Sequence, residues 1–215
     1  MLVPITREKF EELVPTVSTS AQYTYYWGKG PELLRRFLIS FLSLVAVFVV
    51  GSIFGSGLRL IFGLVAGLYW LWAPAMWSSL RNRKYRQFGY SGFWQGQVLD
   101  VFVSEELIGK EETVNEQGEL VIVENRERRI NLEVGDESGF NFNVQAPLKR
   151  EHKAIRSGDV VEMLVFSNRP DLSQVAKVSD AYLPDANLWV SDYPCLQRDV
   201  FVQVSRRLGY EEYAS

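Results

Sequence analysis

Two uncharged apolar runs decide the fold of this chain: FLISFLSLVAVFVVGSIF, Phe37–Phe54, and LIFGLVAGLYWLWAPAMW, Leu60–Trp77. Each run has 18 residues, which as an α-helix would extend about 27 Å, close to the thickness of the hydrocarbon layer of a bilayer. Only residues 55–59 separate the runs, and so short a connection predicts antiparallel neighbours. We therefore expect a two-helix transmembrane hairpin; the alternative is that a run is the buried helix of a soluble protein.

Small residues occur where two such helices would approach each other. Gly51 and Gly55 are four residues apart in the first part of the hairpin, as are Gly63 and Gly67 in the second. Both pairs lie toward the hairpin tip, so we expect them at similar depth, where they would let the helix backbones pack closely. Pro74 should kink the second helix near its end.

Basic residues predict the orientation of the hairpin. Seven of them flank its open end, and one lies at its tip. The flanking residues are Lys29, Arg35, Arg36, Arg81, Arg83, Lys84 and Arg86, and the tip residue is Arg59. This bias predicts that both termini and the soluble domain lie on the cytoplasmic, or stromal, side. The cluster after the second helix, Arg81 to Arg86, has a second possible role in contacting anionic lipid head groups.

Aromatic residues gather at the open end of the predicted hairpin. They are Tyr23, Tyr25, Tyr26, Trp27, Trp70, Trp72 and Trp77. Such a belt is typical of the membrane–water interface, and contact with a pigment or quinone is the alternative. Neither apolar run contains a charged side chain, which argues against a transport path or a proton relay inside the hairpin.

The charge of the chain is unevenly distributed. Residues 1–89 carry 10 basic and 4 acidic groups, a net charge of +6, whereas residues 90–215 carry 13 basic and 22 acidic groups, a net charge of −9. The acidic part would be repelled by phosphates, which excludes nucleic acid as a partner. The first 30 residues show no signal-peptide pattern.

From Gly89 onward the sequence has the alternation and turn residues of short strands. The candidate strands are 94–103, 120–123, 129–134, 140–144, 160–166 and 175–183. They predict a small antiparallel β-barrel or sandwich. A short amphipathic helix is expected around Phe10, and a C-terminal helix from Leu196 to Leu208, ended by Gly209.

We thus predict a membrane α+β protein in four parts. Residues 1–30 form a cytoplasmic segment, 31–88 the transmembrane hairpin, 89–190 the soluble β domain, and 191–215 the C-terminal helix and tail.

The sequence offers little to a catalytic mechanism. The one histidine, His152, lies in a run of charged residues and is expected on the surface. The one cysteine, Cys195, has no histidine near it in sequence, which disfavours a nucleophile. The acid pairs Glu105-Glu106 and Glu111-Glu112 are read as solvated side chains. We expect no enzyme activity, no cofactor and no metal.

Two stretches resemble a known family. They are PITREKFEELVPTVSTSAQYTYYWGKG, residues 4–30, and GFWQGQVLDVFVSEELIGKEETVNEQGELVIVENRERRINLEVGD, residues 92–136. Both are similar to a family of small two-helix proteins of cyanobacterial and chloroplast thylakoids. That family includes the protein called "acclimation of photosynthesis to environment", and its members are often labelled phosphate transporter permeases. The resemblance implies a thylakoid protein associated with photosystem II in assembly, protection or light acclimation.

The expectation for function is therefore an accessory or assembly protein that binds a membrane protein complex and the lipid bilayer. Aromatic anchors would supply affinity. The candidates are Tyr25, Tyr26, Trp27, Trp70, Trp72, Phe93, Trp94 and Trp189. The alternative is an oligomeric component of a membrane transport assembly, and a membrane enzyme is a third possibility.

Overall fold

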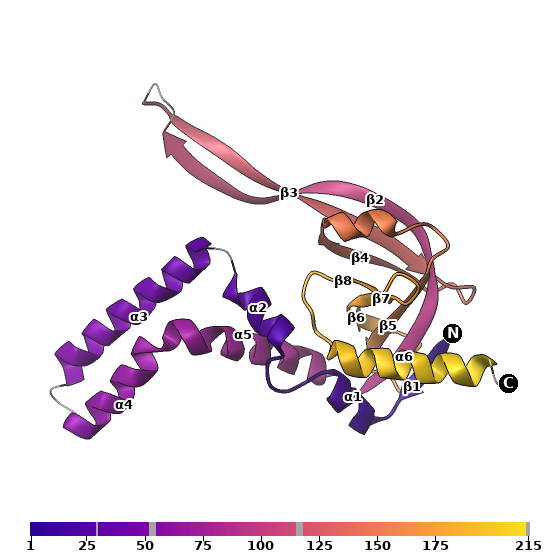
Figure 1. Cartoon of the computed structure of the whole chain (residues 1–215), viewed down its shortest axis with the longest axis horizontal. Coiled ribbons are helices and arrows are strands. Elements are labelled where there is room, and N and C mark those ends of the chain that lie inside the picture. The colour runs from indigo at the N-terminus through magenta and orange to yellow at the C-terminus, as the bar shows by residue number, and fades with distance from the viewer. Residues whose placement is uncertain (29, 52–54, 115–117, 214–215) are drawn as a thin grey trace. The chain divides into compact units, whose positions relative to one another are not determined.

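The computed structural model of the chain describes residues 1–28, 30–51, 55–114 and 118–213, and the side chains of residues 111 and 209–213 lie outside that description. The protein has an α+β fold (Figure 1). It divides into two compact units. The first consists of Met1–Phe10, Phe88–Tyr193 and Gln203–Ser215, and the second of Glu11–Gln87 and Pro194–Val202.

The first unit is built on one antiparallel sheet. Its strands within the described residues are β1 (Leu2–Ile5), β2 (Tyr90–Val114), β3 (Leu120–Gly135), β4 (Asn141–Pro147), β5 (Val160–Ser167), β6 (Val175–Val178), β7 (Ala181–Leu183) and β8 (Leu188–Val190). Their order is β4-β3-β2-β5-β7-β8, with β1 paired to β2 and β6 paired to β5. The predicted antiparallel β domain is confirmed, and the N-terminal segment adds a strand to it.

The predicted closure into a barrel is wrong. The hydrogen-bonded path through the described strands begins at β4 and ends at β8, so the sheet stays open. Both end strands nevertheless contribute to one core, β4 through Val144 and β8 through Leu188 and Val190. Side-chain packing, rather than a closing row of backbone hydrogen bonds, therefore joins the two ends.

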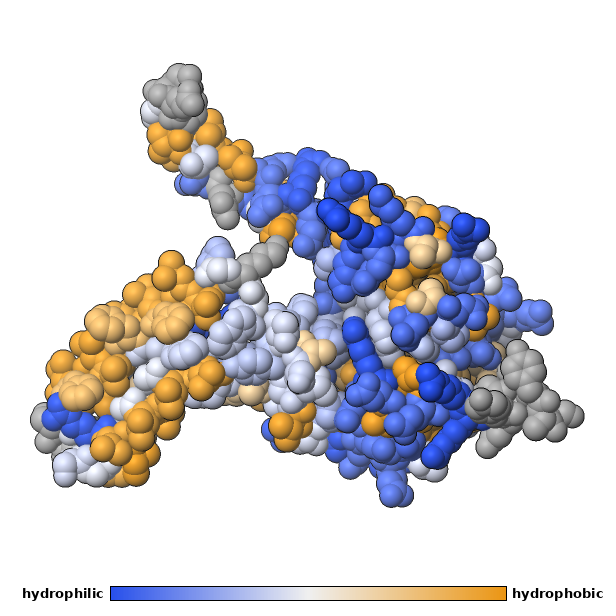
Figure 2. Space-filling view, in the orientation of Figure 1, coloured by the Kyte–Doolittle hydropathy of each residue, from blue (hydrophilic) through white to orange (hydrophobic). Residues whose placement is uncertain are grey.

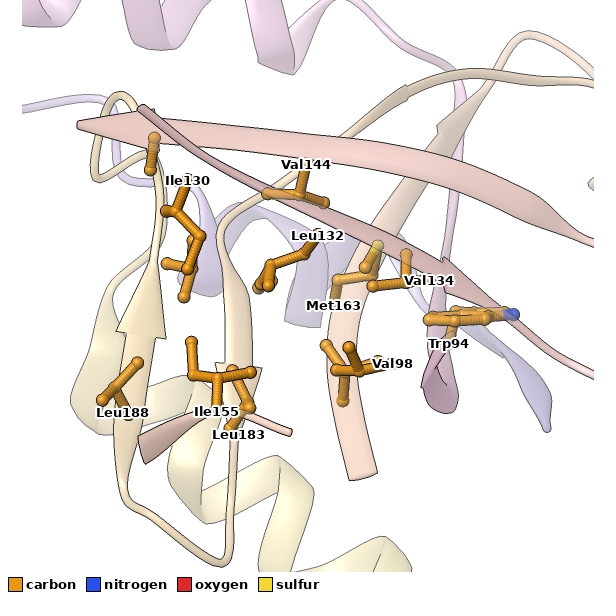
Figure 3. Packing of buried hydrophobic residues seen from close by; sticks show 14 of the residues in the cluster. Trp94, Val98, Ile130, Leu132, Val134, Val144, Ile155, Met163, Leu183 and Leu188 are labelled. Atoms are coloured by element: carbon orange, nitrogen blue, oxygen red, sulfur yellow. The ribbon is translucent and has the colours of Figure 1, made fainter. Parts of the chain in front are cut away.

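The core of this unit is apolar and centred on β2, β3 and β5 (Figure 3). Leu132, Val134 and Met163 have no exposed surface, and each such side chain contributes roughly 1.5–3 kcal/mol through burial. Trp94 closes one end of the core: its ring centroid lies 4.7 Å from that of Phe140. Its indole N–H would be an unpaired donor in an apolar site.

Asp136 supplies the partner for that indole. The Trp94 Nε1–H donates to Asp136 Oδ2 across 2.6 Å. Burial acts to raise the pKa of Asp136, but the hydrogen bonds from Ser138, Trp94 and Phe140 together lower it. Asp136 begins the turn between β3 and β4. Gly139 ends this turn with a φ of +88°, a conformation that favours glycine.

Strand β2 is 25 residues long, far beyond the five or six of an ordinary strand. Residues 91–94 pair with β1 on one edge and with β5 on the other. From Gln97 onward β2 pairs with β3 up to Val114. The far part of this hairpin extends past the core, as the ribbon in Figure 1 shows. We call residues 105–114 of β2 and 120–128 of β3 the β-arm.

The helices are α1 (Arg7–Leu13), α2 (Ser20–Trp27), α3 (Gly30–Val50), α4 (Ser56–Gly67), α5 (Tyr69–Arg86) and α6 (Arg198–Tyr213). Sequence analysis missed α2, although it begins with a capping box in which Thr19 and Gln22 satisfy each other's backbone N–H groups. Helix α6 continues through Gly209 to Tyr213, so the predicted stop at this glycine is wrong.

The second apolar run is not one straight helix. It is divided at Leu68 into α4 and α5, which are bent by 70° relative to each other. Pro74 lies inside α5, which continues past it, so the expected kink at Pro74 stays a prediction. At the break, the backbone N–H of Trp70 donates to Ser40 Oγ at 3.0 Å. A hydroxyl of α3 thus satisfies a donor that the first turn of α5 leaves open.

The predicted two-helix transmembrane hairpin is therefore not confirmed. Among the described residues, α3 alone is long and apolar enough to span a bilayer, and the bent pair α4–α5 would be a second span if it acts as one. The end of the first apolar run, residues 52–54, lies outside the described residues.

Candidate interaction surface

The β-arm presents an apolar surface at its tip. In an antiparallel ladder, directly paired residues point to the same face. The pairs Val114↔Leu120 and Glu112↔Ile122 are two positions apart, so all four side chains share one face. Three of the four are aliphatic and only one is charged.

This tip has no core beneath it. Leu120 is 76% exposed, Ile122 64% and Val114 60%. Figure 2 shows the corresponding apolar surface near the end of the arm. Further exposed apolar side chains follow it toward the base: Val123, Leu107 and Ile108. A strand pair that exposes so many aliphatic side chains is a site for binding or for aggregation.

Charged side chains lie next to the apolar tip, toward the base of the arm. Glu124 forms an ion pair with Arg126 at 2.9 Å and another with Lys110 at 3.7 Å. All three side chains are well exposed, so these pairs contribute little to stability. The β-arm contains six Glu against three Lys or Arg, a net charge of −3. The arm thus combines an aliphatic tip with an acidic stem.

Arg129 marks the base of the arm. Its guanidinium lies 2.7 Å from Asp192, 3.2 Å from Glu106 and 3.8 Å from Glu127, and its side chain is 13% exposed. The contact with Asp192 joins β3 to the segment that follows β8. One cation, held among three carboxylates, therefore fixes the point where the arm leaves the core.

The aromatic residues predicted as anchors near the hairpin lie together in the second unit. The Trp70 ring lies 4.6 Å from Phe37 and 5.8 Å from Trp27, measured between centroids. Tyr25 and Tyr26 pack edge to face at 5.2 Å. These residues and Trp72 remain partly or fully exposed, so contact with a partner stays a prediction for them.

Two of the predicted anchors are core residues instead. Phe93 and Trp94 are each 1% exposed, and a side chain already enclosed by its own chain cannot contact a partner. Strand β1 pairs across both positions, and sequence analysis did not predict this strand. Trp189 is partly buried against Tyr182, 4.6 Å away between centroids.

The glycines predicted for helix packing line a groove rather than a tight contact. Gly63 and Gly67 face α3, where an added Cβ would lie 3.7 Å from Leu44 Cδ1 at either position. Gly51 and Gly55 line the same apolar groove, whose volume is about 840 Å³. Close approach of the helix backbones through these glycines stays a prediction.

The predicted basic cluster, Arg81 to Arg86, lies at the C-terminal end of α5 and is divided between two roles. Arg86 donates to the carbonyls of Glu11 and Val14 and pairs with the Glu11 carboxylate at 3.0 Å. Arg81 lies over the Tyr25 ring at 5.7 Å. Arg83 and Lys84 are exposed. The last two residues are thus the ones most accessible to lipid.

The expected surface position of His152 is wrong. It is 3% exposed, because the 3₁₀ helix Arg150–Ala154 turns its ring inward. Its Nδ1 accepts from the Lys149 backbone N–H at 3.2 Å. Burial, with the charge of Lys149, lowers the pKa of His152. A buried neutral imidazole held by a local turn is a structural feature of the sheet unit.

One buried carboxyl group was also missed by sequence analysis. Glu162, on β5, is 4% exposed. It accepts a hydrogen bond from Gln95 Nε2 at 3.3 Å and interacts with Ser205. Burial raises the pKa of Glu162. No group of three or more His, Cys, Asp or Glu residues that could hold a metal ion occurs among the described residues.

The β-arm is the most distinctive element of the protein, and sequence analysis did not single it out. The sequence signal for the arm was the aliphatic run at residues 120–123 between acidic neighbours. The same run is equally typical of an ordinary core strand.

Comparison with known proteins places the chain in a family. A search of curated proteins and a search of solved structures each found no match. The family model DUF8619, described as a family of unknown function, matches residues 3–212. Because this match covers nearly the whole chain, the protein belongs to the DUF8619 family.

Proposed function

We propose that this protein is a membrane-anchored, non-enzymatic accessory or assembly protein that docks on a membrane protein complex through the β-arm. The observation that carries the proposal is the aliphatic arm tip, where Leu120 and Ile122 are 76% and 64% exposed. Unfavourable exposure of this kind is relieved when a partner covers the surface.

The helices of the second unit support membrane anchoring. Only 11% of the apolar window of α3 is buried, whereas the core helix of a soluble protein would be mostly buried. Figure 2 shows apolar surface over α3 and α4. In this proposal, α3 and the bent pair α4–α5 form two crossings of the bilayer.

The pairing of β1 with β2 supports an even number of crossings. Leu2 pairs with Trp94 in one sheet, so the chain before α3 and the chain after α5 must lie on the same side. A single crossing by α3 would place them on opposite sides. The basic residues at the open end then favour the cytoplasmic or stromal side.

The composition of the arm suggests the chemistry of its partner. The acidic β-arm, with a net charge of −3, would be repelled by an anionic membrane surface. We infer a protein surface with an apolar pocket and a basic rim, since complementary charge sets orientation and association rate. The family resemblance suggests photosystem II in the thylakoid as the complex.

An oligomeric component of a transport assembly is the second candidate. The observation that favours it is the open groove of about 840 Å³ between α3 and α4, lined by Gly63 and Gly67. A helix of a second copy would fit against such small residues.

Capture of the tagged full-length protein from its native membranes, solubilised in mild detergent, tests the proposal. Mass spectrometry and an absorption spectrum should reveal photosystem II subunits with chlorophyll. The double variant Leu120→Ser with Ile122→Ser should lose that complex. Leu99→Ser is the matched control, because Leu99 is 50% exposed on β2 but lies outside the arm.

Two results would contradict the proposal in different ways. A colourless eluate that holds only this chain, or transporter subunits, would reject the accessory role and favour the second candidate. Equal capture by the tip variant and the control would leave the complex in place but reject the β-arm as its docking element.

A further inference from the structure

A pocket of about 350 Å³ lies among α2, α3 and α5 of the second unit. Its lining includes Tyr26, Glu32, Arg35, Arg36, Tyr69 and Trp77. We infer that this pocket binds the phosphodiester head group of an anionic phospholipid. The inference rests on the membrane anchoring proposed above.

The first support is the fixed position of Arg36. Its Nε donates to the Glu32 backbone carbonyl at 3.3 Å, and its Nη2 donates to the carbonyl of Trp27. Within the described structure, its Nη1 is buried and has no hydrogen-bond partner. Two backbone carbonyls thus hold the guanidinium in place at the wall of the pocket, next to the exposed Arg35. A pre-positioned guanidinium binds phosphate oxygens with little loss of side-chain entropy.

The second support is the charge of the lining. Glu32, Arg35 and Arg36 lie on one face of α3 at positions i, i+3 and i+4. Two guanidinium groups and one carboxylate give the pocket a net charge of +1, which a single phosphodiester anion neutralises. The Glu32 carboxylate would repel a second anionic group but can accept hydrogen bonds from head-group hydroxyls.

The third support is the place of the pocket along α3. After Arg36 the helix carries no charge as far as Val50, so Ile39, which also lines the pocket, begins the apolar part. Tyr69 and Trp77 are residue types that favour the head-group region. A lipid could therefore place its phosphate against the arginines and its acyl chains along the apolar part of α3.

The test is native mass spectrometry of the purified full chain in a neutral detergent. Phosphatidylglycerol is compared with phosphatidylcholine of the same acyl chains, and glycerol 3-phosphate represents the head group without a lipid. We expect one phosphatidylglycerol per chain. The variant Arg35→Gln with Arg36→Gln should bind it roughly tenfold more weakly or worse, because charge-assisted hydrogen bonds are lost.

Two further variants keep the test decisive. Arg206→Gln with Arg207→Gln removes the same charge from exposed positions of α6 outside the pocket and should bind as the wild type does. Arg35→Gln alone removes an exposed side chain and leaves the Arg36 contacts intact. Weaker binding by this single variant therefore cannot be explained by misfolding around Arg36. A circular dichroism spectrum should be unchanged for Arg35→Gln.

Three results would overturn the assignment: equal binding of phosphatidylcholine, equal loss in the Arg206/Arg207 variant, or full competition by glycerol 3-phosphate. The last result would indicate a site for a free phosphate compound. Alkaline carbonate extraction of the wild type separates this inference from the anchoring on which it rests. A chain that stays in the membrane but binds no phosphatidylglycerol rejects the pocket alone.

Discussion

Arg129 donates through Nη2 to Oδ1 of Asp192 across 2.7 Å, and this contact joins the base of the β-arm to the chain after β8. The carboxylates of Glu106 and Glu127 form ion pairs with the same guanidinium. Without the arginine, three partly exposed carboxylates would face one another with no cation between them.

Arg129→Ala should therefore lower the free energy of unfolding by roughly 1–3 kcal/mol. Thermal and urea unfolding of the full chain in detergent would measure this loss. The control is Arg128→Ala, the neighbouring exposed arginine, which should change stability by no more than about 0.5 kcal/mol. Equal effects of the two changes would show that the ion-pair network does not stabilise the arm base.

Gly96 should not tolerate alanine. A Cβ there would overlap the ring of Trp94 and lie 2.5 Å from the carbonyl oxygen of Gly135. Neither group can move easily, since one is in the core and the other is backbone. Gly96→Ala is expected to cost about 1–3 kcal/mol. Gly109, in the arm, has no atom within 4 Å of an added Cβ, so Gly109→Ala should be neutral or slightly stabilising, and unfolding midpoints of the two variants should differ clearly.

The buried amide pair of the second unit should show strong coupling. Asn82 Nδ2 donates to Gln22 Oε1 at 2.8 Å, and Gln22 Nε2 donates back to Asn82 Oδ1 at 3.1 Å and to the Cys195 carbonyl at 3.3 Å. Gln22→Leu should lower stability by about 1–3 kcal/mol, because buried polar groups lose their partners.

The double variant Gln22→Leu with Asn82→Leu should recover part of that loss. A double-mutant cycle on unfolding free energies measures the coupling. Purely additive effects would show that the two amides do not act as a pair.

Glu162 makes stability depend on pH. Burial raises its pKa above the ordinary value of 4.5, so the folded state holds this proton more tightly than the unfolded state does. As pH rises from the unfolded pKa through the folded pKa, the contribution of Glu162 to stability is lost. At neutral pH the charged form is the unfavourable one.

Glu162→Gln should therefore raise the unfolding midpoint relative to the wild type above the raised pKa, and this difference should vanish near pH 4. Unfolding midpoints recorded for both proteins from pH 4 to pH 8 test this expectation. A constant difference across that range would assign the effect to packing instead of proton binding.

Some of the fold could be predicted because its signals are local. Alternation at Ile130, Leu132 and Val134 predicts a strand, and these residues are core residues of β3. The uncharged run that begins at Phe37 predicts a helix, and α3 covers it up to Val50. The alternation of apolar residues determines the strand, and the length of the uncharged apolar run determines the helix.

Other features depend on partners distant in sequence. The burial of Phe93 and Trp94 requires strand β1, which lies about 90 residues earlier. The exposure of Leu120 follows from the absence of a core beneath the arm, and an aliphatic strand looks the same in sequence with or without one. The break at Leu68 is equally hard to predict: Gly67 precedes it, but glycine is common inside apolar membrane helices and does not by itself mark a break.

Strand β1 has a consequence for biosynthesis. Its residues leave the ribosome before their partners at positions 91–94, which follow only after α1 to α5. At 5–20 residues per second, this interval lasts about 5–20 s. In the proposed arrangement with two membrane crossings, β1 must remain during this interval on the side of the membrane where β2 will emerge. The sheet would then be completed only after the helices have reached their final topology, and pairing of β1 would serve as a late check on correct insertion.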